Sequence, residues 1–153
     1  MRRVGAYPGP GGADNVELAP ASFGTASNQL LLAIDGRGKG GRLLAMAPGG
    51  GVRMLAVFQY GLNPIVVVGR GDAPRGAARP GLYLTDTLSK NVYFAPAAQF
   101  ASYVGAVFVG REKGRALFWI VRPDGKGFSK ERAHSNLERL PPTWNFEGAT
   151  YIP

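Results

Sequence analysis

The chain contains an internal repeat: residues 3–21 align without a gap with residues 79–97, 76 positions later. Eight of the 19 paired positions are identical, and the identities include a tyrosine and an Asn-Val pair. With small gaps, segments within 30–49 also match segments within 106–125. A fixed period is typical of stacked supersecondary units, each of which buries its apolar face on the next. We therefore expect a single domain over residues 1–153, with repeat units at approximately 3–78 and 79–153.

Most apolar runs have the length of a β-strand and are bounded by turn residues. The chain holds 23 glycines and 12 prolines, which punctuate these runs and supply the backbone angles that tight turns require. The pattern predicts a meander of hairpins. The expected strands are residues 16–19, 29–34, 42–47, 52–59, 64–69, 81–85, 91–95, 104–109, 116–121 and 149–152.

Several of these runs are apolar at every position, notably 30–34, 65–68 and 117–121. A continuously apolar strand is covered on both faces, and no long amphipathic segment lies between these strands to provide a helical cover. Sheets packed on sheets are therefore expected, with short helices only at 97–103 and at 130–140, the latter capped by Ser129.

These features predict an all-β fold, an antiparallel meander of β-propeller-blade type with about two repeat units, which forms an incomplete propeller. A β-sandwich is the alternative. Propeller blades repeat at roughly 40 to 50 residues, so a period of 76 needs a further explanation. Either each unit is a blade with a long insertion, for which 70–80 and 126–142 are candidates, or each unit holds strands of more than one blade.

The chain is basic, with 18 Lys and Arg residues against 10 Asp and Glu residues and a net charge of +8. Such a surplus attracts nucleic acid, anionic lipid or acidic ligands. Its densest parts, 37–42, 70–79, 111–115 and 126–132, fall in stretches expected to be loops. We therefore favour solvated loop charge over an anion-binding surface, and we rank a nucleic-acid partner low without discarding it.

The compartment of the protein stays open. The chain has no cysteine, which excludes disulfides and thiolate metal sites and suits either the cytoplasm or a periplasm. Glycines and prolines interrupt residues 1–12, so they lack the apolar core of a secretory signal, and no apolar run approaches the length of a membrane span. We expect a soluble protein with no membrane partner.

Four segments resemble the six-bladed β-propellers of the NHL, gluconolactonase-like and phytase-related esterase-like families. Residues 81–93, GLYLTDTLSKNVY, are similar to the central hairpin of NHL-type and gluconolactonase-like propellers. Residues 42–52 resemble a strand and turn of the same group, and residues 116–128 repeat that pattern. Residues 146–151, FEGATY, are similar to the opening strand of these propellers. The resemblance implies a propeller fold and either a binding scaffold or a hydrolase.

The length of the chain differs from that of the families it resembles. A six-bladed ring needs roughly 250 to 300 residues, about twice the 153 residues present. We therefore expect a truncated gene, a fragment, or a chain that completes its ring by self-association. Repeat units that lack neighbours leave apolar edges exposed.

The resemblance makes Glu147 a possible metal ligand, because gluconolactonase-like enzymes place a glutamate of their opening strand on a divalent cation. Calcium suits such an oxygen-only site. A turn or edge carboxylate is the favoured alternative. Asp86 follows an apolar strand, where it would either hold a turn by accepting backbone hydrogen bonds, the favoured role, or reach a central channel.

No complete catalytic constellation is evident. His134 is the only histidine, which excludes two-histidine metal sites, and no G-x-S-x-G motif accompanies it. We expect His134 to be an exposed helix residue. The sequence thus favours a scaffold that binds a small molecule or a protein, and part of a metal-dependent lactonase-like or esterase-like hydrolase is the alternative. The substrate or ligand, the oligomeric state and the presence of a metal stay open.

Overall fold

The protein is built from three antiparallel four-stranded sheets, described here from a computed structural model. The structure describes residues 5–7, 11–36, 40–69, 79–114, 117–133 and 144–153. The described elements are β1 (Ala13–Leu18), η1 (Gly24–Ala26), β2 (Leu30–Ile34), β3 (Arg42–Met46), β4 (Val52–Val57), β5 (Leu62–Val67), β6 (Gly81–Asp86), β7 (Asn91–Pro96), η2 (Ala97–Tyr103), β8 (Val107–Arg111), β9 (Lys113–Gly114), β10 (Phe118–Pro123), β11 (Phe128–Arg132) and β12 (Trp144–Ile152).

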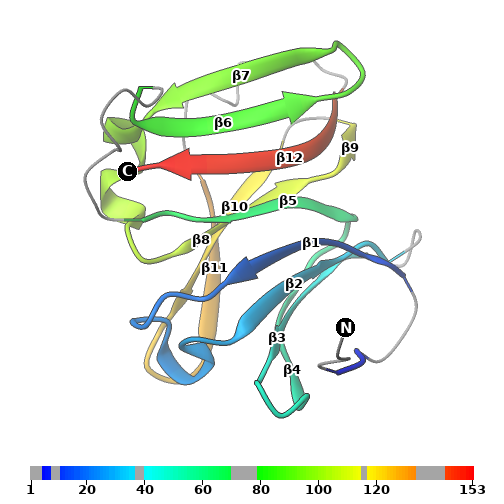
Figure 1. Cartoon of the computed structure of the whole chain (residues 1–153), viewed down its shortest axis with the longest axis vertical. Helices are drawn as coiled ribbons and strands as arrows, with labels where there is room; N and C mark the ends of the chain where they lie inside the picture. The colour runs from blue at the N-terminus through cyan, green and yellow to red at the C-terminus, as the bar shows by residue number, and fades with distance from the viewer. Residues whose placement is uncertain (1–4, 8–10, 37–39, 70–78, 115–116, 134–143) are drawn as a thin grey trace.

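Each sheet has a simple strand order. The N-terminal sheet has the order β1-β2-β3-β4, the middle sheet β5-β8-β10-β11, and the C-terminal sheet β7-β6-β12-β9. The sheets lie one above another, and β1, β5 and β12 run side by side where the three sheets meet (Figure 1). The all-β antiparallel meander expected from the sequence is confirmed, and the described strands do not close into a barrel.

The middle sheet explains the apolar runs at 65–68 and 117–121, because both of its faces are buried. Phe108, Phe118 and Ile120 pack toward the C-terminal sheet, whereas Val107 and Val121 pack toward the N-terminal sheet. Side chains alternate between the faces of a strand, so each face needs its own run of apolar residues. The sheet-on-sheet packing replaces the helical cover that a parallel sheet would require.

Two aromatic and aliphatic cores result from this stacking. Between the middle and C-terminal sheets, the rings of Phe108 and Phe118 stack with centroids 4.9 Å apart, and Phe146 follows Phe118 at 5.4 Å. Phe100, from the short helix η2, closes this core at 5.9 Å from Phe108. The core between the N-terminal and middle sheets is mainly aliphatic, with Leu31 among its fully buried members.

The expected strands all overlap observed ones, and the short helix at 97–103 is present as η2. The helix expected at 130–140 is wrong where the structure describes it, because Ser129 and residues 130–132 belong to β11. Pairing with β10 decides this segment, since an edge strand gains ladder hydrogen bonds that override a local helical pattern. Residues 134–140, including His134, lie outside the described residues.

The two repeat units do not form separate sheets. Strand β5, from the first unit, pairs with β8 of the second unit in the middle sheet. The division at residue 78 therefore stays a prediction about the sequence. Among the described residues, neither helix has the length and hydropathy needed to cross a membrane.

Candidate functional site

The three strands that run side by side each carry a polar residue at a break in their pairing register. In β1 the register shifts between Ala13 and Asn15, at Asp14. The shifts in β5 and β12 likewise include Asn63 and Glu147. Such irregularities re-aim side chains that a regular ladder would hold in alternation. We call the end of the molecule that carries these residues the polar end.

Glu147 receives hydrogen bonds from two asparagine side chains at the polar end. Asn63 Nδ2 donates to Glu147 Oε2 at 3.3 Å, and Asn145 Nδ2 donates to Glu147 Oε1 at 2.9 Å. Asn63 is only 2% exposed, whereas Glu147 is exposed, so this hydrogen bond is partly buried. The structure thus brings Glu147 together with two amides from β5 and β12.

Both amides leave a buried oxygen unsatisfied. Asn63 Oδ1 and Asn145 Oδ1 are inaccessible to solvent and accept no hydrogen bond from the described residues. A buried polar atom without a partner costs roughly 1–3 kcal/mol, so such atoms are rare in folded proteins. Two of them on either side of one carboxylate indicate that this cluster is suited to a further binding partner.

The donor set fits a divalent cation. Turning both amides over exchanges their nitrogen and oxygen atoms, so that two amide oxygens and a carboxylate would face the same point. The present nitrogen-to-oxygen separations of 3.3 and 2.9 Å match the roughly 3 Å between neighbouring oxygen ligands around Ca²⁺. Asn63, Asn145 and Glu147 are therefore the residues that would hold a metal, which the resemblance makes possible at Glu147.

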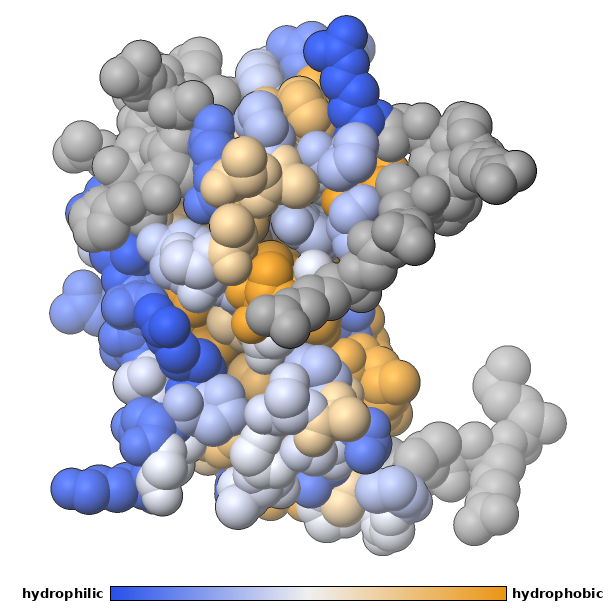
Figure 2. Space-filling model, turned by 90° about the vertical axis from the view of Figure 1, so that its left-hand side faces the viewer, coloured by the Kyte–Doolittle hydropathy of each residue, from blue (hydrophilic) through white to orange (hydrophobic). Residues whose placement is uncertain are grey.

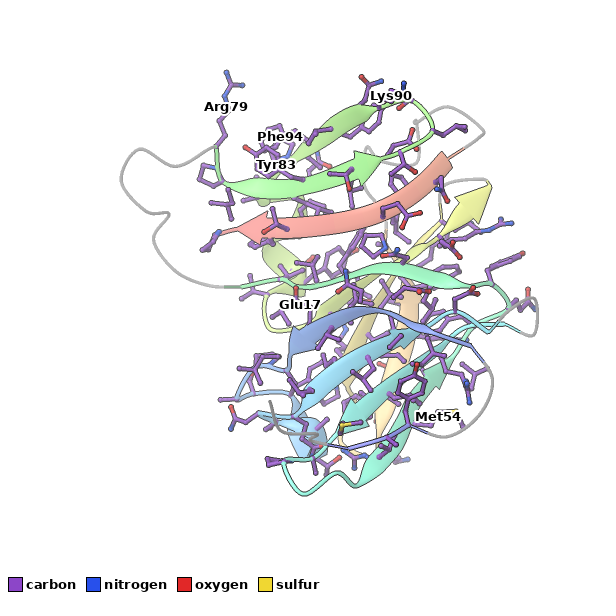
Figure 3. The ribbon with its side chains drawn as sticks, turned by 45° about the vertical axis from the view of Figure 1, so that its right-hand side comes forward. Glu17, Met54, Arg79, Tyr83, Lys90 and Phe94 are labelled. Carbon is purple, nitrogen blue, oxygen red and sulfur yellow. The ribbon has the colours of Figure 1, made fainter. Side chains whose placement is uncertain are left out.

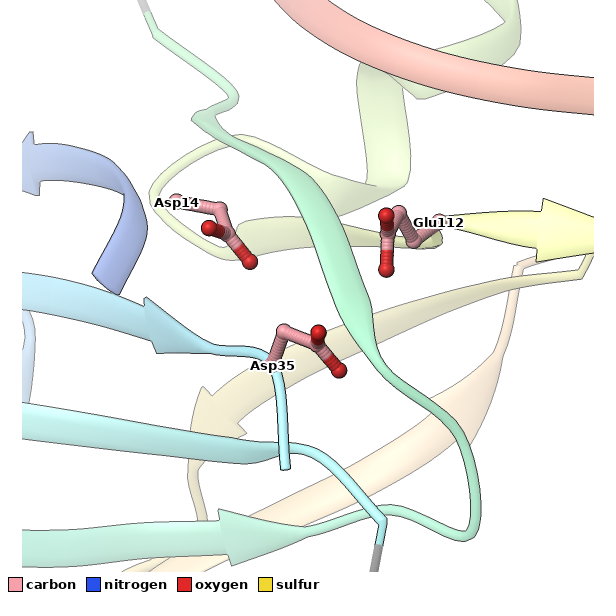
Figure 4. Close-up of side chains that lie close together, drawn as sticks. All are labelled: Asp14, Asp35 and Glu112. Carbon is pink, nitrogen blue, oxygen red and sulfur yellow. The ribbon is translucent and has the colours of Figure 1, made fainter. Parts of the chain in front are cut away.

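Three carboxylates form a second polar cluster beside this one. Oxygen atoms of Asp14, Asp35 and Glu112 lie within 4.8 Å of one another, and Figure 4 shows them converging from three separate segments. The approach is close at Gly61, where a Cβ atom would lie 2.6 Å from Asp35 Oδ1 and 3.0 Å from Glu112 Oε2. A side chain at this position would displace these carboxylates, so glycine lets them approach the chain leading into β5.

Backbone hydrogen bonds join the two clusters. Glu112 N donates to Gly61 O at 3.1 Å, and Phe146 N donates to Glu112 O at 3.0 Å. Glu112 thereby lies between the chain leading into β5 and the start of β12. A shallow depression lined by Glu112, Asp35 and Tyr60 opens here, and the Arg111 guanidinium lies over the Tyr60 ring, 3.9 Å from its centroid.

Asp86 holds a turn. Its carboxylate accepts hydrogen bonds from Leu88 N, from Ser89 N and from the Ser89 hydroxyl, which together close the β6–β7 hairpin. It also accepts Asn145 N at 3.0 Å. Burial alone would raise the pKa of Asp86, but these hydrogen bonds outweigh it and lower the pKa below its ordinary value.

Sequence reasoning identified two residues of this region and missed the others. Glu147 and Asp86 are linked through Asn145, whose side chain contacts the former and whose backbone contacts the latter. Asn63, Asn145 and the carboxylate cluster had no motif to identify them, because their proximity depends on how strands distant in sequence pair. The Asn-Pro pair at 63–64 was the only local signal, and it indicates a turn rather than a ligand.

Comparisons of this chain with protein-family models, with curated proteins and with solved structures find no match.

Proposed function

We propose that this protein is a noncatalytic binding scaffold of propeller type, whose polar end binds a divalent cation through Asn63, Asn145 and Glu147. Calcium is the ion that best suits one carboxylate and two amide oxygens, because it accepts neutral oxygen ligands readily and tolerates irregular geometry. The bound cation would tie β5 to β12 and so join the middle sheet to the C-terminal sheet.

One observation carries the proposal. Asn63 and Asn145 both direct a side-chain amide at Glu147 and both retain a buried oxygen without a donor. In the absence of a cation, the amide nitrogens satisfy the carboxylate at the expense of their own oxygens. With a cation present, amide oxygens and carboxylate would all be coordinated, and the two amide nitrogens would be the groups left to find new acceptors.

The stacking of four-stranded sheets supports the propeller reading. Propellers place consecutive four-stranded sheets around an axis, with one strand of each sheet nearest to it. Here β1, β5 and β12 are the adjacent strands of three stacked sheets (Figure 1), and the polar residues at their register shifts, Asp14, Asn63 and Glu147, lie in the first half of each strand. Ligands held jointly by successive sheets are a natural consequence of that arrangement.

The outer faces of the stack support self-association as a way to complete the ring. Val16 and Leu18 are exposed on the N-terminal sheet, and Val92 and Phe94 are exposed on the C-terminal sheet. Phe94 and Tyr83 lie at the far side of the C-terminal sheet in Figure 3. Figure 2, which views the side of the stack, shows further apolar side chains at the surface between hydrophilic ones. We propose that these faces pack against neighbouring copies.

Thermal unfolding with and without Ca²⁺ tests the cation site. At a free concentration 100 times the Kd, binding stabilises the folded state by about 2.7 kcal/mol, which raises the Tm of a domain this size by roughly 5–10 °C. We expect Glu147→Gln to abolish the rise, because the amide supplies no charge. Glu131→Gln, on the distant strand β11, is the matched control and should retain it.

The same measurement on Asp35→Asn separates the two polar clusters. Suppose that Asp35→Asn abolishes the rise of Tm with Ca²⁺ and that Glu147→Gln retains it. The cation would then bind at the carboxylate cluster, and the assignment to Asn63, Asn145 and Glu147 would be wrong. An unchanged Tm with Ca²⁺, Mg²⁺ and Mn²⁺ would leave the scaffold without a metal.

Part of a metal-dependent lactonase-like or esterase-like hydrolase is the second candidate function. The proximity of Glu112 and Asp35 to the proposed cation favours it, since a carboxylate beside a metal-bound ester can act as a general base. Calcium-dependent hydrolysis of a γ-lactone or of p-nitrophenyl acetate, lost in both Glu147→Gln and Glu112→Gln, would favour the hydrolase. Cation binding without turnover would favour the scaffold.

A further inference from the structure

A depression of about 570 Å³ lies between the outer strands of the N-terminal and middle sheets, far from the polar end along these strands. Strand β4, helix η1 and the turn between β10 and β11 contribute its lining, which includes Thr25, Arg53, Met54, Lys126 and Phe128. We call it the Arg53 pocket. Its lining includes two cations and no acidic side chain, so the local field favours an anion.

Arg53 is held in place from two sides. Its Nη1 donates to Thr25 Oγ1 at 2.7 Å, and its guanidinium carbon lies 5.6 Å from the centroid of the Phe128 ring. Among the described residues, the hydroxyl of Thr25 is the only hydrogen-bond partner of the Arg53 side chain. The remaining N–H groups of the guanidinium are therefore available, in a fixed fork that matches phosphate or carboxylate oxygens.

Lys126 supplies the second charge from a structured turn. Asp124 Oδ1 accepts the backbone N–H groups of Lys126 at 3.0 Å and of Gly127 at 2.7 Å, which fixes the turn and occupies this acidic oxygen. No described carboxylate forms an ion pair with the Lys126 ammonium. The turn thus places the Lys126 ammonium at the rim of the pocket without pairing it in a local salt bridge.

The rest of the wall is apolar. Leu55, Pro123 and Phe128 line the pocket, and Pro123 and Phe128 are only partly buried. A ligand that buried this surface would gain hydrophobic free energy as well as charge pairing. An inorganic ion would use only the two cations and would leave most of the volume to water.

We infer that the Arg53 pocket binds a small organic anion, with a phosphate or carboxylate head held between Arg53 and Lys126 and an apolar body against Pro123 and Phe128. The basic segment 126–132, expected from the sequence to be solvated loop charge, contributes one of the two cations. This site is independent of the proposed cation site.

Isothermal titration calorimetry with phenyl phosphate tests the inference, in buffer with EDTA so that no divalent cation takes part. We expect one site per chain, and at least tenfold weaker binding of inorganic phosphate, which lacks the apolar body. Benzoate should also bind, whereas phenol, which lacks the charge, should not. Equal affinity for phosphate and phenyl phosphate would overturn the role of the apolar wall.

Variants locate the binding. Lys126→Gln removes an exposed charge and no packing, and we expect it to weaken phenyl phosphate at least tenfold, as Arg53→Gln should. Arg79→Gln and Lys90→Gln are the controls, since these cations lie at the opposite end of the molecule from Met54 (Figure 3). An equal loss of phenyl phosphate affinity in the two control variants would mean that the anion is attracted only by the net charge of the protein. If no anion gave a heat of binding at millimolar concentration, the assignment of the pocket would be wrong.

Discussion

Asp86 Oδ1 accepts a hydrogen bond from the backbone N–H of Asn145 at 3.0 Å, so the carboxylate that closes one hairpin also fixes the start of another strand. The same Asn145 donates its side-chain amide to Glu147. A residue with a purely structural role therefore positions a proposed ligand. Asn145 thus connects Asp86 to Glu147, although no direct hydrogen bond joins these two carboxylates.

Replacing Asp86 with alanine should destabilise the protein by about 1–3 kcal/mol, because the part-buried hydrogen bonds that this carboxylate accepts from Ser89 and Asn145 would be lost. Urea unfolding monitored by circular dichroism measures the loss. Asp124→Ala removes a comparable carboxylate from an exposed turn and should cost less than half as much. A similar cost for both variants would mean that the Asp86 link to β12 contributes nothing.

The acid stability of the protein should depend on Asp86. The pKa of Asp86 is lower in the folded than in the unfolded state. The stability that its ionised carboxylate adds to the folded state is therefore fully present above the unfolded pKa of about 3.9, and it is lost as pH falls through the folded pKa. Urea unfolding between pH 2 and pH 7 should show a smaller decline in Asp86→Asn than in the parent protein. Parallel declines would contradict this linkage.

Glu17 should have the opposite effect. Burial raises its pKa, and a hydrogen bond from the Leu18 backbone only partly offsets that increase. Glu17 is paired opposite Leu31 and lies on the face that packs toward the middle sheet (Figure 3). Folding therefore favours the protonated form, so Glu17→Gln should stabilise the protein at pH 7 and have no effect at pH 3. Destabilisation at pH 7 would show that the carboxylate makes a favourable interaction.

Truncation of Phe118 should open the aromatic core between the middle and C-terminal sheets. Phe118 is 1% exposed and contacts the rings of Phe108 and Phe146, so Phe118→Ala should cost about 3–5 kcal/mol. Leu88→Ala, at a side chain 62% exposed in the β6–β7 turn, should cost under about 0.5 kcal/mol. Chemical denaturation of both variants decides whether this core joins the sheets as described.

Gly81 should not tolerate a side chain. Its φ is +153°, and a Cβ atom would lie 2.3 Å from the backbone oxygen of Ala95 on the paired strand β7. Gly81→Ala should destabilise the C-terminal sheet by roughly 1–3 kcal/mol. Gly49→Ala is the control, because a Cβ atom there meets nothing within 4 Å. Equal melting temperatures for the two variants would contradict the close approach.

Light scattering tests self-association through the two outer faces. If neighbouring copies complete a ring, the mass in solution should be a small multiple of 16.2 kDa, and Val92→Asp should reduce it toward the monomer. An aspartate at this exposed position should change the stability of the monomer little, but it would place an unpaired charge inside an interface between copies. A monomeric parent protein at micromolar concentration would remove this part of the proposal.

The sequence by itself determined the strands and the class of fold. Apolar runs of strand length, bounded by glycine and proline, specify backbone conformation locally, and strands apolar on both faces, such as 117–121, require cover on both sides. The turn role of Asp86 was also predictable, since a carboxylate after a strand accepts nearby backbone N–H groups. These are interactions between residues close in sequence.

The tertiary structure alone decided which strands pair and which polar groups meet. Pairing of β5 with β8 and of β6 with β12 spans tens of residues, so no local pattern fixes it. Asn63 reaches Glu147 only because their strands run side by side with a shifted register at each position. The segment 130–132 became a strand because it pairs with β10 across the short turn at 124–127, and this pairing was stronger than its own helical pattern.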